Sequence, residues 1–271
     1  MYKNVILIVA LQITLADMDC TSESEPPKYY LIEKCRRSKL GIVAYANFSS
    51  LTSCKRLGVE KKGLALNFSP LEARGDGMDQ YSCEVLRCAE VEGGWSLVND
   101  TRFDYYSLYA KPLPSVNSTC VTATGMFYLL PDQKNYTEAL LECKNMTGML
   151  ADIIAEHRTE TLAQVLIEAD ADTAFIGMRR LNKSSFSTDK GNTLDCTTYR
   201  AWAPGHPNKN FYDYDCMLIT RHKTWMTTSC NEPHQRRSIF ASRLKNGTNN
   251  LVSKCTLKCQ WVCHLFVRLQ M

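Results

Sequence analysis

Metal binding is the first chemistry that the sequence suggests, in and just after the stretch AWAPGHPNKN at 201–210. The side chains able to bind a cation are His206, Asn208, Asp213, Asp215 and His222. The two imidazoles and the carboxylates are suitable zinc ligands, but no i, i+4 helical spacing and no Cys-x-x-Cys pair holds them together. This spacing favours surface histidines over a zinc site.

Catalysis is not indicated by any motif. The sequence has no Gly-x-Ser-x-Gly, no His-Glu-x-x-His and no P-loop. Its five histidines lie at 157, 206, 222, 234 and 264, without an evident acidic or nucleophilic partner. We therefore expect a protein that is not an enzyme.

The elements that must position these residues are two helices followed by strands. In NYTEALLECKNMTG, Asn135 can cap a helix, Glu138 can complete a capping box and Gly148 can close the helix. The apolar stripe of 156–169 predicts a second helix. AFIGM, CMLIT and the segment around Trp225 read as strands. The fold class expected is α+β, a small disulfide-stabilised domain.

The order of these landmarks resembles a C-type lectin-like domain over about 120 residues. The landmarks are Ala139 and Cys143, then GMLA at 148–151, FIGM at 175–178, Trp202 to Asn208, Cys216, Trp225 and Cys230. The resemblance implies two helices, small antiparallel sheets and a long loop pinned by a Cys216–Cys230 disulfide. It also implies a candidate ligand-binding loop made of Trp202, His206, Pro207, Asn208, Asp213, Asp215 and Trp225.

The calcium site of sugar-binding family members is degraded in this sequence. Those members use a Glu-Pro-Asn or Gln-Pro-Asp pair, a nearby acid, and an Asn-Asp after the late Trp. Here His206 and Tyr214 replace the two acids, Met226 and Thr227 replace Asn-Asp, and Asn208 is kept. Calcium takes six to eight oxygen ligands, so one amide cannot hold it against water. We therefore expect no metal and no cofactor. The alternative is that a shift of the loop brings the aspartates flanking Tyr214 into the place of the lost acid and restores calcium binding.

Cysteine usage indicates an oxidising compartment and departs from the family at one position. The sequence has 13 cysteines, an odd number, which leaves a thiol free or shared between chains, as in a disulfide-linked oligomer. The family usually pairs the helix cysteine, Cys143, with one in the last strand, where this sequence has Ala241. Cys120, Cys196 and the tail cysteines remain open as its partner.

Export is expected from the first residues and from the glycosylation sequons. Residues 1–16 have one Lys and an apolar run too short to span a membrane, which is typical of a signal peptide. The expected glycosylation sites are Asn47, Asn99, Asn117, Asn135, Asn145, Asn182 and Asn246; Asn67 is weaker because Pro70 follows its sequon. The formal charge of +4 is dispersed, so neither nucleic acid nor a membrane span is expected.

The chain divides into two cysteine-rich units. We expect a module at 29–110, a linker at 111–119, the lectin-like domain at 120–243 and a cysteine-bearing tail at 244–271. The module resembles a PAN or apple-like domain: a helix with Cys54, the strand LALNFS, Cys83, Cys88 and a closing Tyr-rich strand. A generic disulfide-stapled domain is the equal alternative. Arg74-Gly75-Asp76 reads as an exposed turn, with integrin-type binding as the alternative.

The function expected is secreted, extracellular, non-enzymatic recognition of a glycan or protein ligand without calcium. The alternatives are a calcium-dependent carbohydrate-binding lectin and a structural matrix or adhesion protein. If the protein binds its ligand without calcium, the stability of the candidate loop should come from Trp202, Pro204, Pro207 and the Cys216–Cys230 bridge. His206 and Asn208 should then contribute little.

Overall fold

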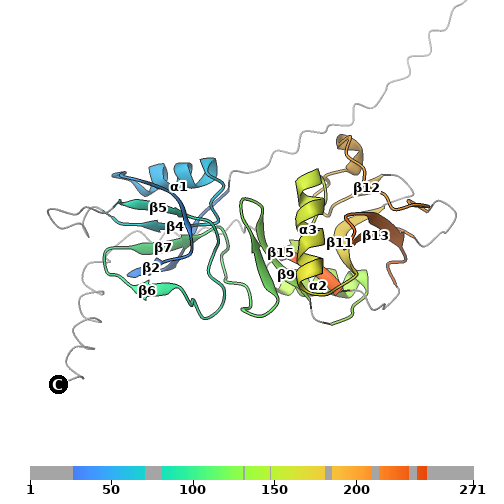
Figure 1. Cartoon of the computed structure of the whole chain (residues 1–271), viewed down its shortest axis with the longest axis horizontal. Coiled ribbons are helices and arrows are strands. Elements are labelled where there is room, and N and C mark those ends of the chain that lie inside the picture. The colour runs from blue at the N-terminus through green and yellow to red at the C-terminus, as the bar shows by residue number, and fades with distance from the viewer. Residues whose placement is uncertain are drawn as a thin grey trace, which may run out of the picture.

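The computed structural model describes residues 27–70, 81–130, 132–146, 148–180, 185–208, 214–231 and, as backbone, 237–242. These residues form two units that lie next to each other along the longest axis of the molecule (Figure 1). Several predictions fall outside the described residues: the signal peptide, Arg74-Gly75-Asp76, Asn182, Asp213, Asn246 and the tail cysteines.

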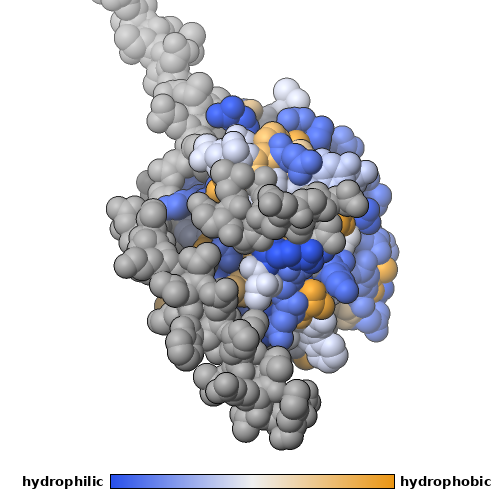
Figure 2. All heavy atoms as spheres, turned by 90° about the vertical axis from the view of Figure 1, so that its left-hand side faces the viewer, coloured by the Kyte–Doolittle hydropathy of each residue, from blue (hydrophilic) through white to orange (hydrophobic). Residues whose placement is uncertain are grey.

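The N-terminal unit is an antiparallel sheet covered by one helix. The sheet order is β1 (Tyr30–Glu33), β7 (Asp104–Ser107), β4 (Ala65–Phe68), β5 (Cys83–Leu86) and β3 (Ile42–Ala46). A second small sheet pairs β2 (Arg36–Ser38) with β6 (Leu97–Asn99). Figure 2 shows the end face of this unit, where single hydrophobic residues lie among mostly hydrophilic ones.

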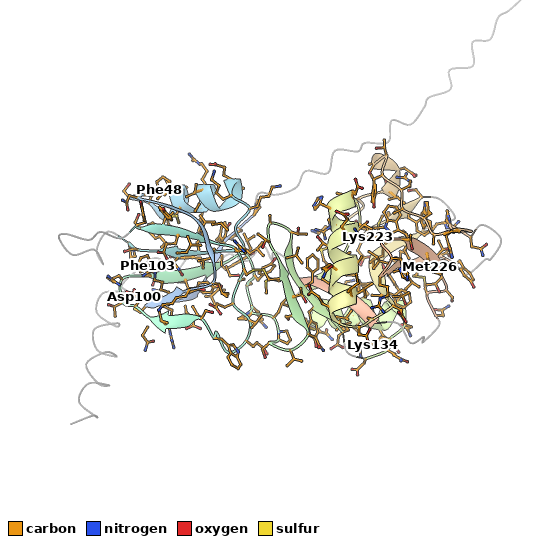
Figure 3. The ribbon with its side chains drawn as sticks, viewed as in Figure 1. Phe48, Asp100, Phe103, Lys134, Lys223 and Met226 are labelled. Carbon is orange, nitrogen blue, oxygen red and sulfur yellow. A yellow bond between two sulfur atoms is a disulfide. The ribbon has the colours of Figure 1, made fainter. Side chains whose placement is uncertain are left out.

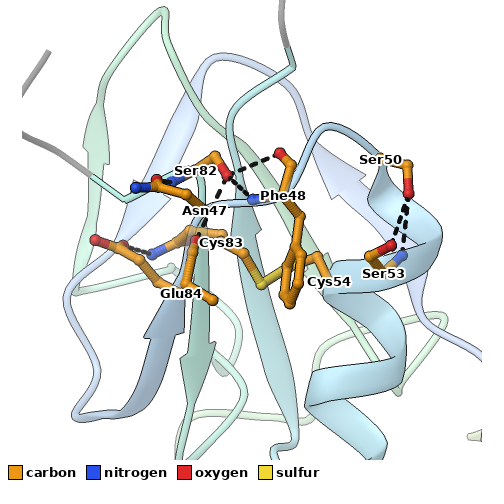
Figure 4. The surroundings of a disulfide bond; sticks show 10 residues. Asn47, Phe48, Ser50, Ser53, Cys54, Ser82, Cys83 and Glu84 are labelled. Carbon is orange, nitrogen blue, oxygen red and sulfur yellow. Dashed lines mark hydrogen bonds between the residues drawn. A yellow bond between two sulfur atoms is a disulfide. The ribbon is translucent and has the colours of Figure 1, made fainter.

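The helix of this unit, α1 (Leu51–Glu60), is fixed to the sheet by a disulfide. Ser50 caps the helix by accepting a hydrogen bond from the Ser53 N–H, and Cys54 is bonded to Cys83 of β5 (Figure 4). The Ser82 hydroxyl accepts from the Phe48 N–H at 2.7 Å and donates to the Phe48 carbonyl at 2.9 Å. The predicted helix and apolar strand are therefore present, although the PAN or apple-like assignment itself stays a prediction.

The C-terminal unit is a larger sheet with two helices. Its main sheet runs in the order β14 (Trp225–Thr228), β13 (Cys216–Thr220), β11 (Thr173–Arg180), β15 (Arg237–Ser242), β9 (Gly125–Leu129) and β8 (Ser118–Val121). Two shorter strands join it: β10 (Gly148–Leu150) pairs with β15, and β12 (Phe186–Ser187) pairs with β11. Only β11 and β15 are parallel among the described pairs. The predicted α+β class is confirmed.

The two helices of this unit begin where the sequence predicts. In α2 (Tyr136–Asn145), Asn135 and Glu138 form the predicted capping box, with both hydrogen bonds at 2.9–3.0 Å. The prediction that Gly148 closes this helix was wrong: Met146 is the C-cap, and Gly148 starts β10. The second helix, α3 (Glu156–Glu168), buries the predicted stripe of Leu162, Val165 and Leu166.

The two units pack against each other and share a buried core. The Cys88–Cys120 disulfide crosses between them, and the Met126 N–H donates to the Tyr109 hydroxyl at 2.9 Å. Leu113, in the predicted linker, is buried and its carbonyl accepts from the Glu92 N–H at 2.8 Å. One buried cluster contains residues of both units, among them Leu86, Ala89, Tyr105, Met126, Leu130 and Tyr136. No helix among the described residues is long and apolar enough to cross a membrane.

Candidate functional site

The first part of the candidate loop, residues 199–208, is fixed to the edge strand β14 by backbone hydrogen bonds and by contacts between aromatic rings. The Ala203 N–H donates to the Trp225 carbonyl at 2.9 Å, and the Trp225 N–H donates to the Ala201 carbonyl at 2.7 Å. The Trp202 ring meets the Trp225 ring edge-on, with centroids 5.5 Å apart. Tyr199 meets Trp225 in the same way at 5.2 Å.

Trp225 also ties this loop to α3. Its side chain is fully buried, and its indole N–H donates to the Thr159 hydroxyl at 3.1 Å. The next residue, Met226, lies in the part of the C-terminal unit farthest from the N-terminal unit (Figure 3). The candidate site is therefore at the outer end of the molecule, away from the junction of the two units.

His206 and Thr227 hydrogen-bond to each other. The Thr227 N–H donates to His206 Nδ1 at 2.9 Å, and the Thr227 hydroxyl lies 3.0 Å from the same nitrogen. Because Nδ1 accepts a backbone N–H, the neutral imidazole carries its proton on Nε2. Burial lowers the pKa of His206 from its ordinary value of 6.5, which also favours the neutral ring.

Asn208 joins the same set of contacts through its backbone. Its N–H donates to the Thr227 hydroxyl at 2.9 Å, and the intervening His206–Pro207 peptide bond is cis. Thr227 thus bonds to two positions of the candidate loop at once. That His206 and Asn208 add little to the loop's stability stays a prediction, although each shares a half-buried hydrogen bond with Thr227.

Asp215 faces a cation of the protein itself. Its carboxylate lies 3.5 Å from Arg180 Nε, an ion pair, and its carbonyl accepts from the Arg180 N–H at 2.7 Å. Arg180 also donates to the Tyr214 carbonyl at 3.1 Å. One of the two carboxylates predicted to compensate for the lost calcium ligands, that of Asp215, is therefore engaged by a guanidinium; the other, Asp213, lies outside the described residues.

The donors of this site do not suit a metal ion. Within the described ranges, no group of three or more His, Cys, Asp or Glu side chains is placed to hold one. His206 Nδ1 and the Thr227 hydroxyl are engaged with each other. Calcium prefers several carboxylate and carbonyl oxygens that converge on one point. Those of the predicted residues that the structure describes are not brought into such an arrangement.

The disulfide implied by the family resemblance is present. Cys216 and Cys230 are bonded, with their Cα atoms 5.2 Å apart, and the bridge links β13 to the chain after β14. The Cys230 carbonyl accepts from the Tyr136 N–H at 3.2 Å, so the bridge also fixes the start of α2.

Cys143 is the free cysteine among the described residues, and it is buried. Two of its candidate partners are engaged elsewhere: Cys120 pairs with Cys88, and Cys196 is disulfide-bonded. Burial raises the pKa of the Cys143 thiol to about 12, so it stays protonated at neutral pH. At position 241, where the family resemblance implies the partner cysteine, the sequence has Ala241, whose backbone pairs with Met149 of β10.

The described sequons differ in their accessibility. Asn47, Asn99, Asn117 and Asn145 are exposed, whereas Asn135 is half-buried and caps α2 through its side-chain oxygen. Asn67, the weaker sequon, is fully buried and its amide donates to the Ser38 carbonyl at 2.8 Å and to Glu84 at 2.9 Å. Its place in the buried strand β4 prevents a glycan there.

Sequence reasoning missed the structural roles of Thr227 and Thr159. Both are buried threonines whose hydroxyls bond to groups at least 19 positions away, namely Asn208 and Trp225. Thr227 was noted only as a lost metal ligand. For Thr227 a signal was available in principle, since a threonine in a buried strand needs a partner for its hydroxyl.

Comparison with known proteins identifies part of the chain. Residues 132–236 match the family model of the lectin C-type domain. Collectin-10 of Homo sapiens is 26% identical over 110 residues, which cover 41% of this chain and 39% of that protein. Collectin-11 of Bos taurus is 24% identical over 110 residues, which cover 41% of each. The chain spans about two fifths of the length of these curated relatives.

Solved structures are also similar to about half of the chain. One is the cow C-type carbohydrate-recognition domain of CD23, crystallised with a GlcNAc2Man3 oligosaccharide; it is 21% identical, with a TM-score of 0.40, covering 49% of this chain and 96% of that one. Another is human lithostathine, 18% identical, with a TM-score of 0.39, covering 48% and 95%. With the family model and the element order above, residues 132–236 are identified as a C-type lectin domain.

Proposed function

We propose that this protein is a secreted, non-enzymatic recognition protein whose C-type lectin domain binds a glycan or protein ligand without calcium. The observation that carries the proposal is the contact of Thr227 with His206 Nδ1, at 2.9 Å from the backbone N–H and 3.0 Å from the hydroxyl. Both residues stand where sugar-binding relatives would supply calcium ligands. Here they hold the candidate loop together without an ion.

The energetic argument concerns what calcium would have to displace. An ion at this place would need to break the hydrogen bonds of Thr227 to His206 and to the Asn208 N–H. Each broken bond leaves a half-buried group unpaired, which costs about 1–3 kcal/mol. The replacement ligands would include the Asn208 amide but no carboxylate, because positions 206, 214, 226 and 227 are His, Tyr, Met and Thr. Loop closure without calcium is therefore the more stable state.

Secretion is supported by the disulfides. Cys54–Cys83, Cys88–Cys120 and Cys216–Cys230 all have Cα separations of 5.2–6.0 Å, which suit disulfide geometry. Stable bridges of this kind persist in oxidising compartments and are rare in the cytosol. Recovery of the glycosylated protein from the culture medium would test this part of the proposal.

The test of calcium independence is calorimetry of the secreted full chain, combined with a glycan array read with and without chelator. We expect no calcium heat up to millimolar concentrations, and array signals that chelator leaves unchanged. A calcium site in the micromolar to millimolar range, or array binding abolished by chelator, would establish the calcium-dependent lectin instead.

A pair of variants makes this test sharper. His206→Glu alone should not create calcium binding, because positions 226 and 227 still supply no carboxylate. The quadruple variant His206→Glu, Tyr214→Glu, Met226→Asn, Thr227→Asp restores the family's ligand set and should bind calcium. Tight binding by the single variant would show that an aspartate near Tyr214 already completes the site.

A further inference from the structure

A hollow of the C-terminal unit lies outside the candidate loop. It is a groove of about 520 Å³ between α2, β10, the end of β11 and the turn after β12. Small-molecule sites usually measure about 300–1,000 Å³. Its lining residues are Leu140, Lys144, Gly148, Met149, Arg179, Ser187, Thr188, Asp189, Lys190 and Gly191. We call it the α2–β10 groove.

The charged residues of this groove are mainly basic. Lys144, Arg179 and Lys190 contribute three positive charges, and Asp189 contributes one negative charge. Asp189 lies 3.8 Å from Lys144 Nζ and 3.9 Å from Arg179 Nε, too far to hydrogen-bond to either. Lys190 forms no ion pair with any residue that the structure describes. The groove therefore has a net charge of +2, with donors left for an anion.

One buried donor at this groove also lacks an acceptor. Arg179 lines the groove, and its Nε is buried and, among the described residues, has no hydrogen-bond acceptor. Buried donors in native proteins nearly always have an acceptor, and leaving one without costs about 1–3 kcal/mol. An oxygen-rich anion bound in the groove would supply an acceptor for this guanidinium.

Two apolar side chains also line the groove. These are Leu140 of α2 and Met149 of β10, and both are only partly buried. A groove that combines cations with apolar side chains suits a ligand that has a charged group on a ring with C–H faces. Inorganic anions would use the cations alone.

We propose that the α2–β10 groove binds the acidic group, sulfate or carboxylate, of a glycan, with Lys144, Lys190 and Arg179 contacting the anion and Leu140 and Met149 contacting the sugar ring. This site goes beyond the candidate loop, since none of its lining residues belongs to 199–208. It does not rest on the absence of calcium there.

The experiment measures binding of four probes to the full-length secreted protein after enzymatic removal of N-glycans, because the Asn145 sequon adjoins Lys144. The probes are sulfated lactose, sialyllactose, lactose and inorganic sulfate, all in chelator. At least one acidic glycan should bind at least tenfold more tightly than lactose and than inorganic sulfate. Sulfated lactose carries no carboxylate and sialyllactose carries no sulfate, so these two arms tell sulfate from carboxylate. Equal binding of inorganic sulfate and both acidic glycans, or no binding of either glycan, would overturn the proposal.

Variants assign the binding to the groove. Lys144→Gln with Lys190→Gln should weaken the preferred glycan at least tenfold. The matched control, Lys34→Gln with Lys61→Gln, removes the same charge from exposed lysines of the N-terminal unit and should change binding less than twofold. Equal loss in both double variants would show attraction by net charge alone and refute the site. His206→Gln in the candidate loop should leave this affinity unchanged, so failure of the calcium proposal and failure of this one give different results.

Discussion

The candidate loop and the α2–β10 groove treat their polar groups in opposite ways. In the loop, His206, the Asn208 N–H and Thr227 satisfy one another within 3.0 Å. In the groove, Arg179 Nε is buried without an acceptor among the described residues. In the loop that the family motifs mark as a binding site, these polar groups are hydrogen-bonded to one another. In the groove, which no motif marks, a buried donor has no acceptor.

The difference shows that residue types alone do not reveal whether a site is open. A histidine in a loop reads as a metal ligand, and a lysine on a helix reads as a solvated charge. Only the partners of each atom tell whether it is available to a ligand. The predictions below would break or sharpen this comparison.

The largest expected effect is on the aromatic support of the loop. Trp225→Ala removes a fully buried indole and its hydrogen bond to Thr159, so we expect a loss of about 3–5 kcal/mol in the free energy of unfolding. Urea unfolding of the secreted protein measures it. Trp95→Ala is the control, because this ring is 85% exposed and its loss should cost no more than about 0.5 kcal/mol. Similar losses in both variants would contradict the role given to Trp225.

A smaller effect should follow from removing one hydroxyl. Thr227→Val keeps the shape but leaves the Asn208 N–H without its acceptor, which should cost about 1–3 kcal/mol. Thr122→Val, at an exposed threonine, should stay within about 0.5 kcal/mol of the wild type. Unfolding curves in urea compare the two, and an unchanged Thr227→Val midpoint would mean that the loop is not held by this contact.

Acidification should weaken the loop modestly through His206. Its folded-state pKa lies below the ordinary 6.5, so the unfolded chain takes up a proton more readily than the folded one. The contribution is complete above pH 6.5 and is lost as the pH falls from there toward the lowered pKa. The urea midpoint of unfolding should therefore decrease more between pH 7.5 and pH 5.0 for the wild type than for His206→Gln. Equal falls would show that the ring is not held in its neutral form.

The smallest effect concerns the thiol in the helix that forms one wall of the groove. Cys143 is buried and its pKa is raised to about 12, so an alkylating reagent should not modify it in the folded protein at pH 7.5. In urea, without reductant, the peptide containing Cys143 should become alkylated. Mass spectrometry of that peptide reads both states. Rapid alkylation of the folded protein would mean that the region around α2 opens.

Local sequence signals predicted much of the fold. The capping box at Asn135 and Glu138, the stripe of α3 and the strand CMLIT are all determined by near neighbours in the chain. Gly148 shows the limit of such reasoning. It follows the helix, as a closing glycine would, yet it starts β10 because its strand pairs with β15, almost a hundred positions later. Pairing at that distance leaves no local signal.

The sequence by itself determined the family frame: the Cys216–Cys230 spacing, the order of helices and strands, and the loss of the acids at 206 and 214. Tertiary structure decided which polar atoms have a hydrogen-bond or ion-pair partner within the protein. It brought Thr227 onto His206 across 21 positions, joined the two units through Cys88 and Cys120, and placed Lys190 beside α2. The physical reason is that hydrogen bonds and charge interactions act over a few ångströms in space, and chain folding alone sets which residues come within that range.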